Sequence, residues 1–288
     1  MTGSMSADVV IAALGRLRQE FPNLAAVTPR FEENAQRAVA RLGLVALRKR
    51  RLSLLTALEA LDFGSNRAIL TALNHQVAAL RGAPNVEGVL GRLAECERGT
   101  LLATISELTL ATHLQGLGAE VSFTAAYRLV SSDVNAPRDV DILAHWTWGA
   151  AALEVYSPTH ELHNTCDGAI GLRPEGLGAQ ILKKIYHKFG DGSARCEGLP
   201  PGALKVLALD LTYNDAALVS LTLQMGLVEV ELQAMAGLGG ADTALVFTHQ
   251  QGVQGHPVVV AGLLCPSAGC GPLFRSLGVV KPHHSDGR

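Results

Sequence analysis

Two carboxylates stand within otherwise apolar segments and are the side chains of this chain best suited to chemistry. Asp141 lies in residues 138–144, Arg-Asp-Val-Asp-Ile-Leu-Ala, and Glu154 lies in residues 152–156, Ala-Leu-Glu-Val-Tyr. A strand rich in Val, Ile, Leu and Ala is normally buried, and an unpaired buried carboxylate is costly. Two neighbouring carboxylates also repel each other unless a cation or a shared proton lies between them. We therefore expect a metal site at these two residues.

The two segments are predicted to form an antiparallel hairpin, because only a short connection separates them. If the loop consists of Thr147 and Trp148 alone, Asp141 falls directly opposite Glu154. A bulge after the loop would shift this pairing by one residue. Asp139 lies on the same face of the strand and competes for the metal role, but Asp141 sits deeper in the apolar run and is preferred.

A third carboxylate, Glu107, is placed on the inward stripe of a helix predicted over residues 99–117. At 100° per residue, this stripe also carries Ala103, Leu110, Ala111 and Leu114. An inward carboxylate needs a partner. An arginine or a position at the edge of the stripe would satisfy Glu107, and so would a metal ion.

The elements that must position these residues follow a mixed order. Residues 1–98 are predicted to be a helical N-terminal region, and residues 99–288 an α/β domain with a mixed central sheet. The order from residue 99 is helix, three strands, helix, strand, helix and two strands, which differs from a Rossmann alternation. The expected elements are a long helix at 31–61, strands at 119–124, 138–144, 152–156, 205–212, 243–248 and 257–264, and helices at 99–117, 179–189 and 216–235.

Composition restricts the functional classes. Hydrophobic residues make up 48% and charged residues 17% of the 288 residues, so the chain can build a large core. The net charge of −2 argues against a protein that coats nucleic acid or membrane non-specifically. No signal peptide or transmembrane segment is evident. Five scattered cysteines suit reduced thiols, and we expect a cytoplasmic protein.

These features together resemble the PD-(D/E)XK nuclease superfamily over about residues 99–212. The resemblance rests on Glu107, Asp141 and Glu154, and on Gln180 with Lys183 or Lys184 in the next helix. It implies a restriction-endonuclease-like αβββαβ core. It also implies that the acidic residues Glu107, Asp141 and Glu154 hold Mg²⁺, or Mn²⁺ in its place, and that the protein hydrolyses phosphodiester bonds of DNA or RNA.

The chain departs from the family motif at one position. The motif places a lysine two residues after the third-strand acid, where this chain has Tyr156. A phenol with a pKa near 10 supplies no cation at neutral pH. Either Lys184 or Lys183 reaches in from the helix on its flexible stem, or the site is inactive. In the active case, Lys184 offsets negative charge on the phosphate, and Gln180 orients water or backbone.

Nucleic acid is the expected partner, and the N-terminal helices are the expected contact surface. Residues 1–100 carry a net charge of +4, whereas residues 101–288 carry −6. The basic run Arg48-Lys49-Arg50-Arg51 is either a phosphate-contacting patch or a solvated helix face. No membrane contact is expected, and a homodimer is one assembly open to the chain.

Two other interpretations compete with an active nuclease. The first is a catalytically inactive protein of the same fold that serves as a nucleic-acid-binding or protein-interaction module. The second is a zinc protein that uses ligands in a loop, because His and Cys are common zinc ligands. The candidate zinc ligands are His160, Glu161, His163 and Cys166, with Cys265 and Cys270 as a further pair.

Overall fold

The structure is a computed structural model that describes residues 2–49, 53–62, 64–96, 101–157, 177–212, 239–249, 258–264 and 267–278. The chain divides into two compact units. The first unit comprises Met1–His113, Val121–Thr124 and His249–Val258. The second unit comprises Leu114–Glu120, Ala125–Thr248 and Val259–Arg288. The candidate helix at 216–235 lies outside the described residues.

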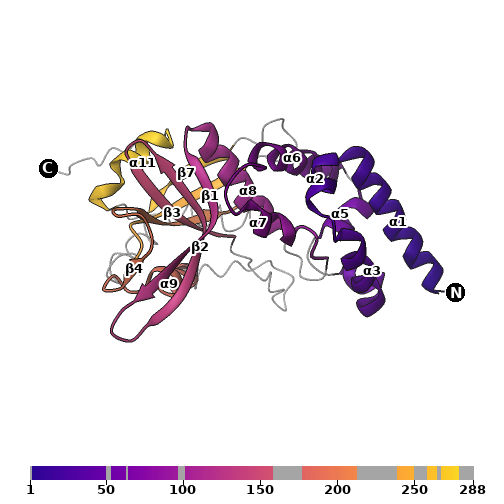
Figure 1. The fold of residues 1–288 in the computed structure, drawn as a ribbon, viewed down its shortest axis with the longest axis horizontal. Helices are drawn as coiled ribbons and strands as arrows, with labels where there is room; N and C mark the ends of the chain where they lie inside the picture. The colour runs from indigo at the N-terminus through magenta and orange to yellow at the C-terminus, as the bar shows by residue number, and fades with distance from the viewer. Residues whose placement is uncertain are drawn as a thin grey trace, which may run out of the picture. The chain divides into compact units, whose positions relative to one another are not determined.

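The first unit is built from helices (Figure 1). α1 packs against α2, α3 and α5, and α2 packs against α6 and α7. In α3, the buried residues Phe31, Ala35, Ala38 and Val39 recur at the spacing of one helical face. No helix in the described ranges is long and apolar enough to cross a membrane. The helices are α1 (Thr2–Glu20), α2 (Pro22–Val27), α3 (Phe31–Leu42), α4 (Leu44–Arg48), α5 (Leu54–Glu59), α6 (Gly64–Leu80), α7 (Val86–Arg92) and α8 (Leu101–Gly116).

The prediction of one long helix over residues 31–61 is wrong, because this stretch contains α3, α4 and α5. Gly43 separates the first two with φ 73° and ψ 152°, a positive-φ conformation that glycine adopts readily and that interrupts helical geometry. Ser53 starts the third with a capping box: its backbone N–H donates to Thr56 Oγ1 at 2.9 Å, and its Oγ accepts from the Thr56 N–H at 3.3 Å.

The strands pair in the order β4-β1-β2-β3-β5-β6-β7. β1 pairs antiparallel with β4, and β2 with β3, whereas β3, β5 and β6 run parallel to one another. The expected mixed α/β architecture is therefore confirmed. The strands are β1 (Glu120–Val130), β2 (Asn135–Trp146), β3 (Gly149–Tyr156), β4 (Arg195–Glu197), β5 (Leu204–Asp210), β6 (Thr243–His249) and β7 (Val258–Leu264), and η1 (Ala268–Cys270) and α11 (Gly271–Ser276) follow.

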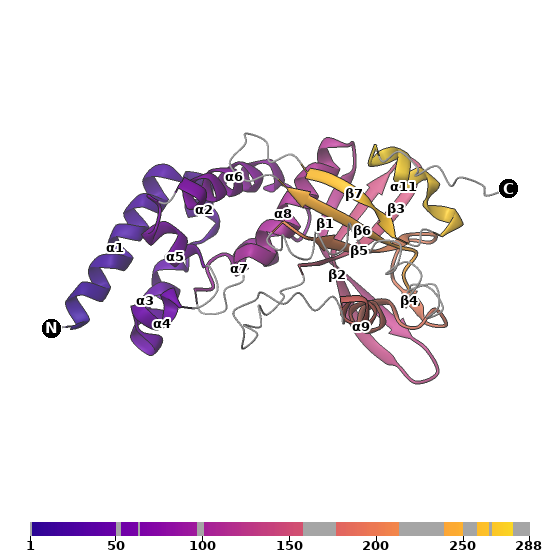
Figure 2. The same ribbon diagram turned by 180° about the vertical axis from the view of Figure 1, so that it is seen from behind.

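The helix α9 (Leu177–Phe189) covers one face of this sheet, as Figure 2 shows from behind. Its residues Ile181, Leu182 and Ile185 are buried in one cluster with Leu207 and Leu209 of β5. Phe189 joins a second cluster with residues of β1, β2 and β3. Apolar burial of this kind is the main force that fixes a surface helix on a sheet. The polar side of α9 is thereby held beside β2 and β3.

Candidate functional site

Asp141 and Glu154 lie opposite each other on the β2–β3 hairpin. The paired residues run from Trp146↔Gly149 to Ile142↔Leu153. The loop therefore consists of two residues, which is the first of the two alternatives predicted from the sequence. Continuing this register places Asp141 opposite Glu154, with both side chains on the same face. The Glu154 side chain is only 2% exposed.

Among the described residues, a backbone N–H holds the Asp141 carboxylate. Its Oδ2 accepts a hydrogen bond from the Val155 N–H at 2.8 Å. Burial, and next the negative charge of Glu154, raise the pKa of Asp141 to about 6, although the Val155 N–H and two nearby lysines oppose the increase. Within the described ranges, no lysine or arginine lies at ion-pair distance from Asp141.

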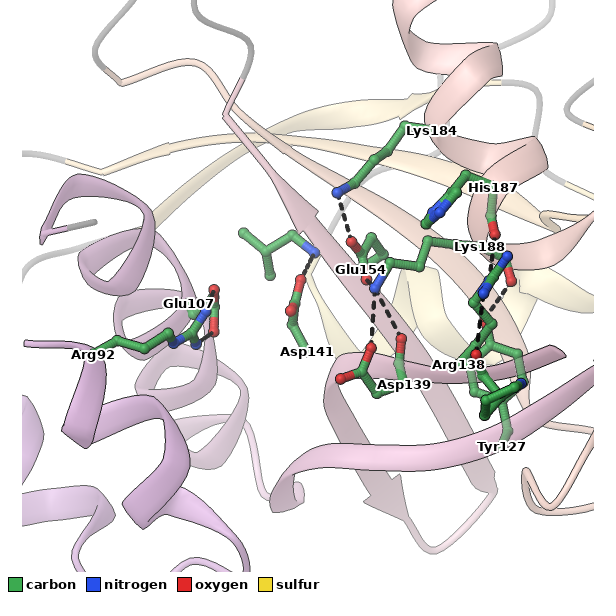
Figure 3. A network of polar contacts seen from close by, with 12 residues as sticks. Arg92, Glu107, Tyr127, Arg138, Asp139, Asp141, Glu154, Lys184, His187 and Lys188 are labelled. Atoms are coloured by element: carbon green, nitrogen blue, oxygen red, sulfur yellow. Dashed lines mark hydrogen bonds and ion pairs between the residues drawn. The ribbon is translucent and has the colours of Figure 1, made fainter. Parts of the chain in front are cut away.

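Glu154, in contrast, is contacted by two lysines of α9 (Figure 3). Lys184 Nζ lies 2.8 Å from Glu154 Oε1, and Lys188 Nζ lies 2.9 Å from Glu154 Oε2. The two lysines are one helical turn apart and project from the same side of the helix. α9 therefore supplies the positive charge that β3 lacks.

Lys188 also binds the strand β2. Its Nζ donates to the Asp139 backbone oxygen at 3.0 Å and to Asp139 Oδ1 at 3.3 Å. Burial by itself lowers the pKa of this lysine, but the charges of Glu154, Asp141 and Asp139 outweigh burial, so the pKa of Lys188 is raised. Lys188 is thus a fixed cation between two carboxylates.

Backbone carbonyls at the end of α9 are held by β1 and β2. The Tyr127 hydroxyl donates to the Lys188 backbone oxygen, and Arg138 Nε donates to the His187 backbone oxygen at 3.0 Å. The last carbonyls of a helix have no partner within the helix, so these side chains stabilise its end. They also fix the backbone that carries Lys188.

Tyr156, which stands where the family resemblance predicts a lysine, packs beside Lys184. The Lys184 Nζ lies 5.7 Å from the centre of the Tyr156 ring, within range of a cation–π interaction. The Tyr156 hydroxyl donates to Gln180 Oε1 at 3.1 Å. Burial raises the pKa of Tyr156, so the phenol stays neutral at physiological pH. Lys183 is exposed, and Lys184 is the neighbour that reaches the carboxylate.

Glu107 has an arginine partner in the first unit. Arg92 Nη1 lies 3.0 Å from Glu107 Oε1, and Arg92 Nη2 contacts Glu107 Oε2 in the bidentate arrangement that Figure 3 draws. An arginine partner is one of the alternatives predicted for the inward position of Glu107 on α8. The role of Glu107 as a metal ligand stays a prediction.

The carboxylates of the second unit have the chemistry of a hard-cation site. Glu154 Oε2 is buried and lies 2.9 Å from Lys188 Nζ. Asp141 and Glu154 therefore offer oxygen ligands that fit Mg²⁺ or Mn²⁺, ions that keep several waters. A group of three or more His, Cys, Asp or Glu residues arranged to hold a metal does not occur in the part of the chain that the structure describes.

Other predicted features are only partly within the described residues. Arg48 of the basic run forms an ion pair with Glu59, and Lys49 is exposed, whereas Arg50 and Arg51 lie outside the described residues. His160, Glu161, His163, Cys166 and Cys265 also lie outside the described residues.

Sequence reasoning missed the role of Lys188 and its bond to Asp139. The available signal was the spacing of Lys184 and Lys188, which places both on one side of α9. Without knowledge of how the helix docks on the sheet, this spacing does not show whether acidic residues lie beside the two lysines.

Comparisons with known proteins add no relative: no family model matches this chain, and no curated protein or solved structure matches it significantly.

Proposed function

We propose that this protein is a divalent-metal-dependent nuclease that hydrolyses phosphodiester bonds of DNA or RNA. The observation that carries the proposal is the juxtaposition of Asp141 and Glu154 on one face of a hairpin, with no cation paired to Asp141 among the described residues. Such a carboxylate destabilises the fold at neutral pH, since its pKa is raised to about 6. A role in binding a divalent cation would explain why an aspartate occupies this buried position.

The order of elements supports a restriction-endonuclease-like core. α8, β1, β2, β3, α9 and β5 follow the helix–three strands–helix–strand order of that core, with the short edge strand β4 inserted before β5. Asp141 and Glu154 stand on the second and third strands, where the superfamily motif places its acids. Order and position together are more specific than either carboxylate alone.

Each residue has a distinct role in the proposed reaction. Asp141 and Glu154 would hold Mg²⁺ or Mn²⁺, which when bound lowers the pKa of water and offsets negative charge on the phosphate. Asp141 is mostly ionised at neutral pH, because its pKa of about 6 lies below that value. The Lys184 ammonium lies 2.8 Å from Glu154. It would supply the positive charge of the motif lysine, whose position in this chain is occupied by Tyr156.

The test is metal-dependent cleavage of a panel of single- and double-stranded DNA and RNA by the full chain. We expect cleavage with Mg²⁺ or Mn²⁺, none with a chelator, and loss of cleavage in Asp141→Asn. Asp133→Asn is the matched control, since Asp133 is an exposed aspartate in the β1–β2 loop. Cleavage that survives Asp141→Asn would remove the assignment.

An inactive module of the same fold is the second candidate. It is favoured by the two lysines that already contact Glu154, because they neutralise that carboxylate without any added cation. This candidate predicts binding of nucleic acid or protein that is insensitive to divalent cations, together with no cleavage of any substrate in the panel.

A further inference from the structure

We propose that Lys184 is the resident counter-ion of Glu154, and that it leaves Glu154 Oε1 when a divalent cation binds. Lys188, in contrast, stays in place and positions the carboxylate. This inference rests on the proposed function, because it concerns the cation of the same site. It assigns two lysines of one helix to different tasks.

The contacts of Lys188 explain why it stays. Its side chain is 12% exposed and contacts Glu154 Oε2, Asp139 Oδ1 and the Asp139 backbone oxygen. The backbone carbonyl of Lys188 accepts the hydroxyl of Tyr127, so the helix itself is tied to β1 at this residue. To move Lys188 would break several interactions at once, including its ion pair with Asp139.

Lys184 has fewer contacts to lose. Its side chain is 32% exposed, and its partners in the described structure are Glu154 Oε1 and the face of the Tyr156 ring. The ring contact attracts an ammonium group but fixes no single orientation. The four-carbon stem can therefore carry the ammonium away from Oε1 while the ring keeps it near the site.

Lys184 and a divalent cation compete for the same oxygen. Mg²⁺ binds carboxylate oxygens at about 2.0–2.1 Å, and the Lys184 ammonium already lies 2.8 Å from Oε1. Two cations so close to one oxygen would repel each other strongly. Once released from Glu154, the Lys184 ammonium is free to contact the phosphate of a bound nucleic acid and to offset its negative charge.

The experiment measures Mn²⁺ affinity by isothermal titration calorimetry at neutral pH and fixed ionic strength, without nucleic acid. We expect Lys184→Met to bind Mn²⁺ roughly three- to tenfold more tightly than the wild type, because one competing charge is removed. Lys183→Met is the matched control, since Lys183 is the adjacent, exposed lysine on the same helix. It removes the same charge from the chain, and we expect an unchanged affinity.

Lys184→Gln is the second variant, and we expect it to tighten Mn²⁺ binding as Lys184→Met does. Equal or weaker Mn²⁺ binding in both Lys184 variants, or no Mn²⁺ binding by any form, would overturn the inference. Cleavage by the wild type is scored separately. Cleavage with unchanged Mn²⁺ affinity in the variants rejects the counter-ion role alone, whereas tighter binding without any cleavage rejects only the nuclease.

Discussion

Asp141 and Glu154 are directly opposite each other on the β2–β3 hairpin, yet among the described residues lysines form ion pairs with only Glu154 of the two. The two carboxylates therefore have different partners. Glu154 is paired with Lys184 and Lys188, whereas Asp141, among the described residues, has a backbone N–H as its partner and a raised pKa. Each consequence of this asymmetry can be measured.

Asp141→Asn should stabilise the metal-free protein at neutral and higher pH. The pKa of Asp141 is about 6 in the folded protein against 3.8 ordinarily, so the folded state holds the proton more tightly. The charged form therefore weakens folding as pH rises through this window, and the weakening is complete above it. We expect the variant to gain about 1–3 kcal/mol at about pH 8 and almost nothing at about pH 4.

Urea unfolding in the presence of a chelator, across this pH range, measures that gain. Asp133→Asn serves as the control, and the difference between its free energy of unfolding and that of the wild type should not change with pH. A variant at Asp141 that is less stable than the wild type at high pH would show that the carboxylate stabilises the fold.

Lys188→Met should cost more folding stability than Lys184→Met. Lys188 is the more buried and contacts both Asp139 and Glu154, so its removal breaks two ion pairs and leaves the buried Glu154 with Lys184 as its lysine partner among the described residues. We expect a loss of about 2–4 kcal/mol for Lys188→Met, and less than about 1 kcal/mol for Lys184→Met, whose side chain is a third exposed. Urea unfolding at neutral pH compares them, and the reverse ranking would contradict the fixed role of Lys188.

Gly240→Ala should disturb the end of α9. A Cβ at Gly240 would lie 2.0 Å from the Phe189 backbone oxygen, and the Gly240 N–H donates to the Gly190 oxygen at 2.9 Å. Relieving this overlap requires a backbone shift, for which we expect a loss of about 1–3 kcal/mol. Thermal unfolding measures it. Gly91→Ala in α7 is the control, because a Cβ there meets nothing within 4 Å, and it should be neutral or stabilising.

Tyr156→Phe should leave any cleavage within about threefold of the wild type. The phenol is neutral at physiological pH, and its hydroxyl bonds only the exposed Gln180 among the described residues. The ring that contacts Lys184 remains in the variant. The pH dependence of the cleavage rate checks this, because a catalytic phenolate would give a rate that rises in alkali and is lost in the variant.

The hairpin could be predicted from local sequence, but its register could not. A two-residue loop and a bulge after the loop were both compatible with the sequence, and only the structure shows the two-residue loop that places Asp141 opposite Glu154. The break at Gly43 could not be separated from an ordinary helical glycine, because helical periodicity continues on both sides of it. β4 was missed because three edge residues carry no periodic signal.

The network around Lys188 could not be predicted for a different reason. Its partners Asp139 and Glu154 lie on two strands, and the contact depends on how α9 docks across them. Helix periodicity assigns Lys188 to the polar side of α9 but does not say that acids lie beneath that side. The same holds for Glu107. Its inward position predicted that it needs a partner, but only the tertiary structure shows that the partner is Arg92.

The most direct measurement is the single-turnover rate of cleavage of one labelled nucleic acid, taken from the substrate panel, over a Mn²⁺ titration. Wild type and Asp133→Asn should cleave at the same rate, with a saturable dependence on Mn²⁺. Asp141→Asn should lose about a hundredfold or more in rate, as expected when a ligand of the catalytic ion is removed. Equal rates in Asp141→Asn and the wild type, or cleavage that persists in a chelator, would contradict a metal-dependent nuclease centred on Asp141 and Glu154.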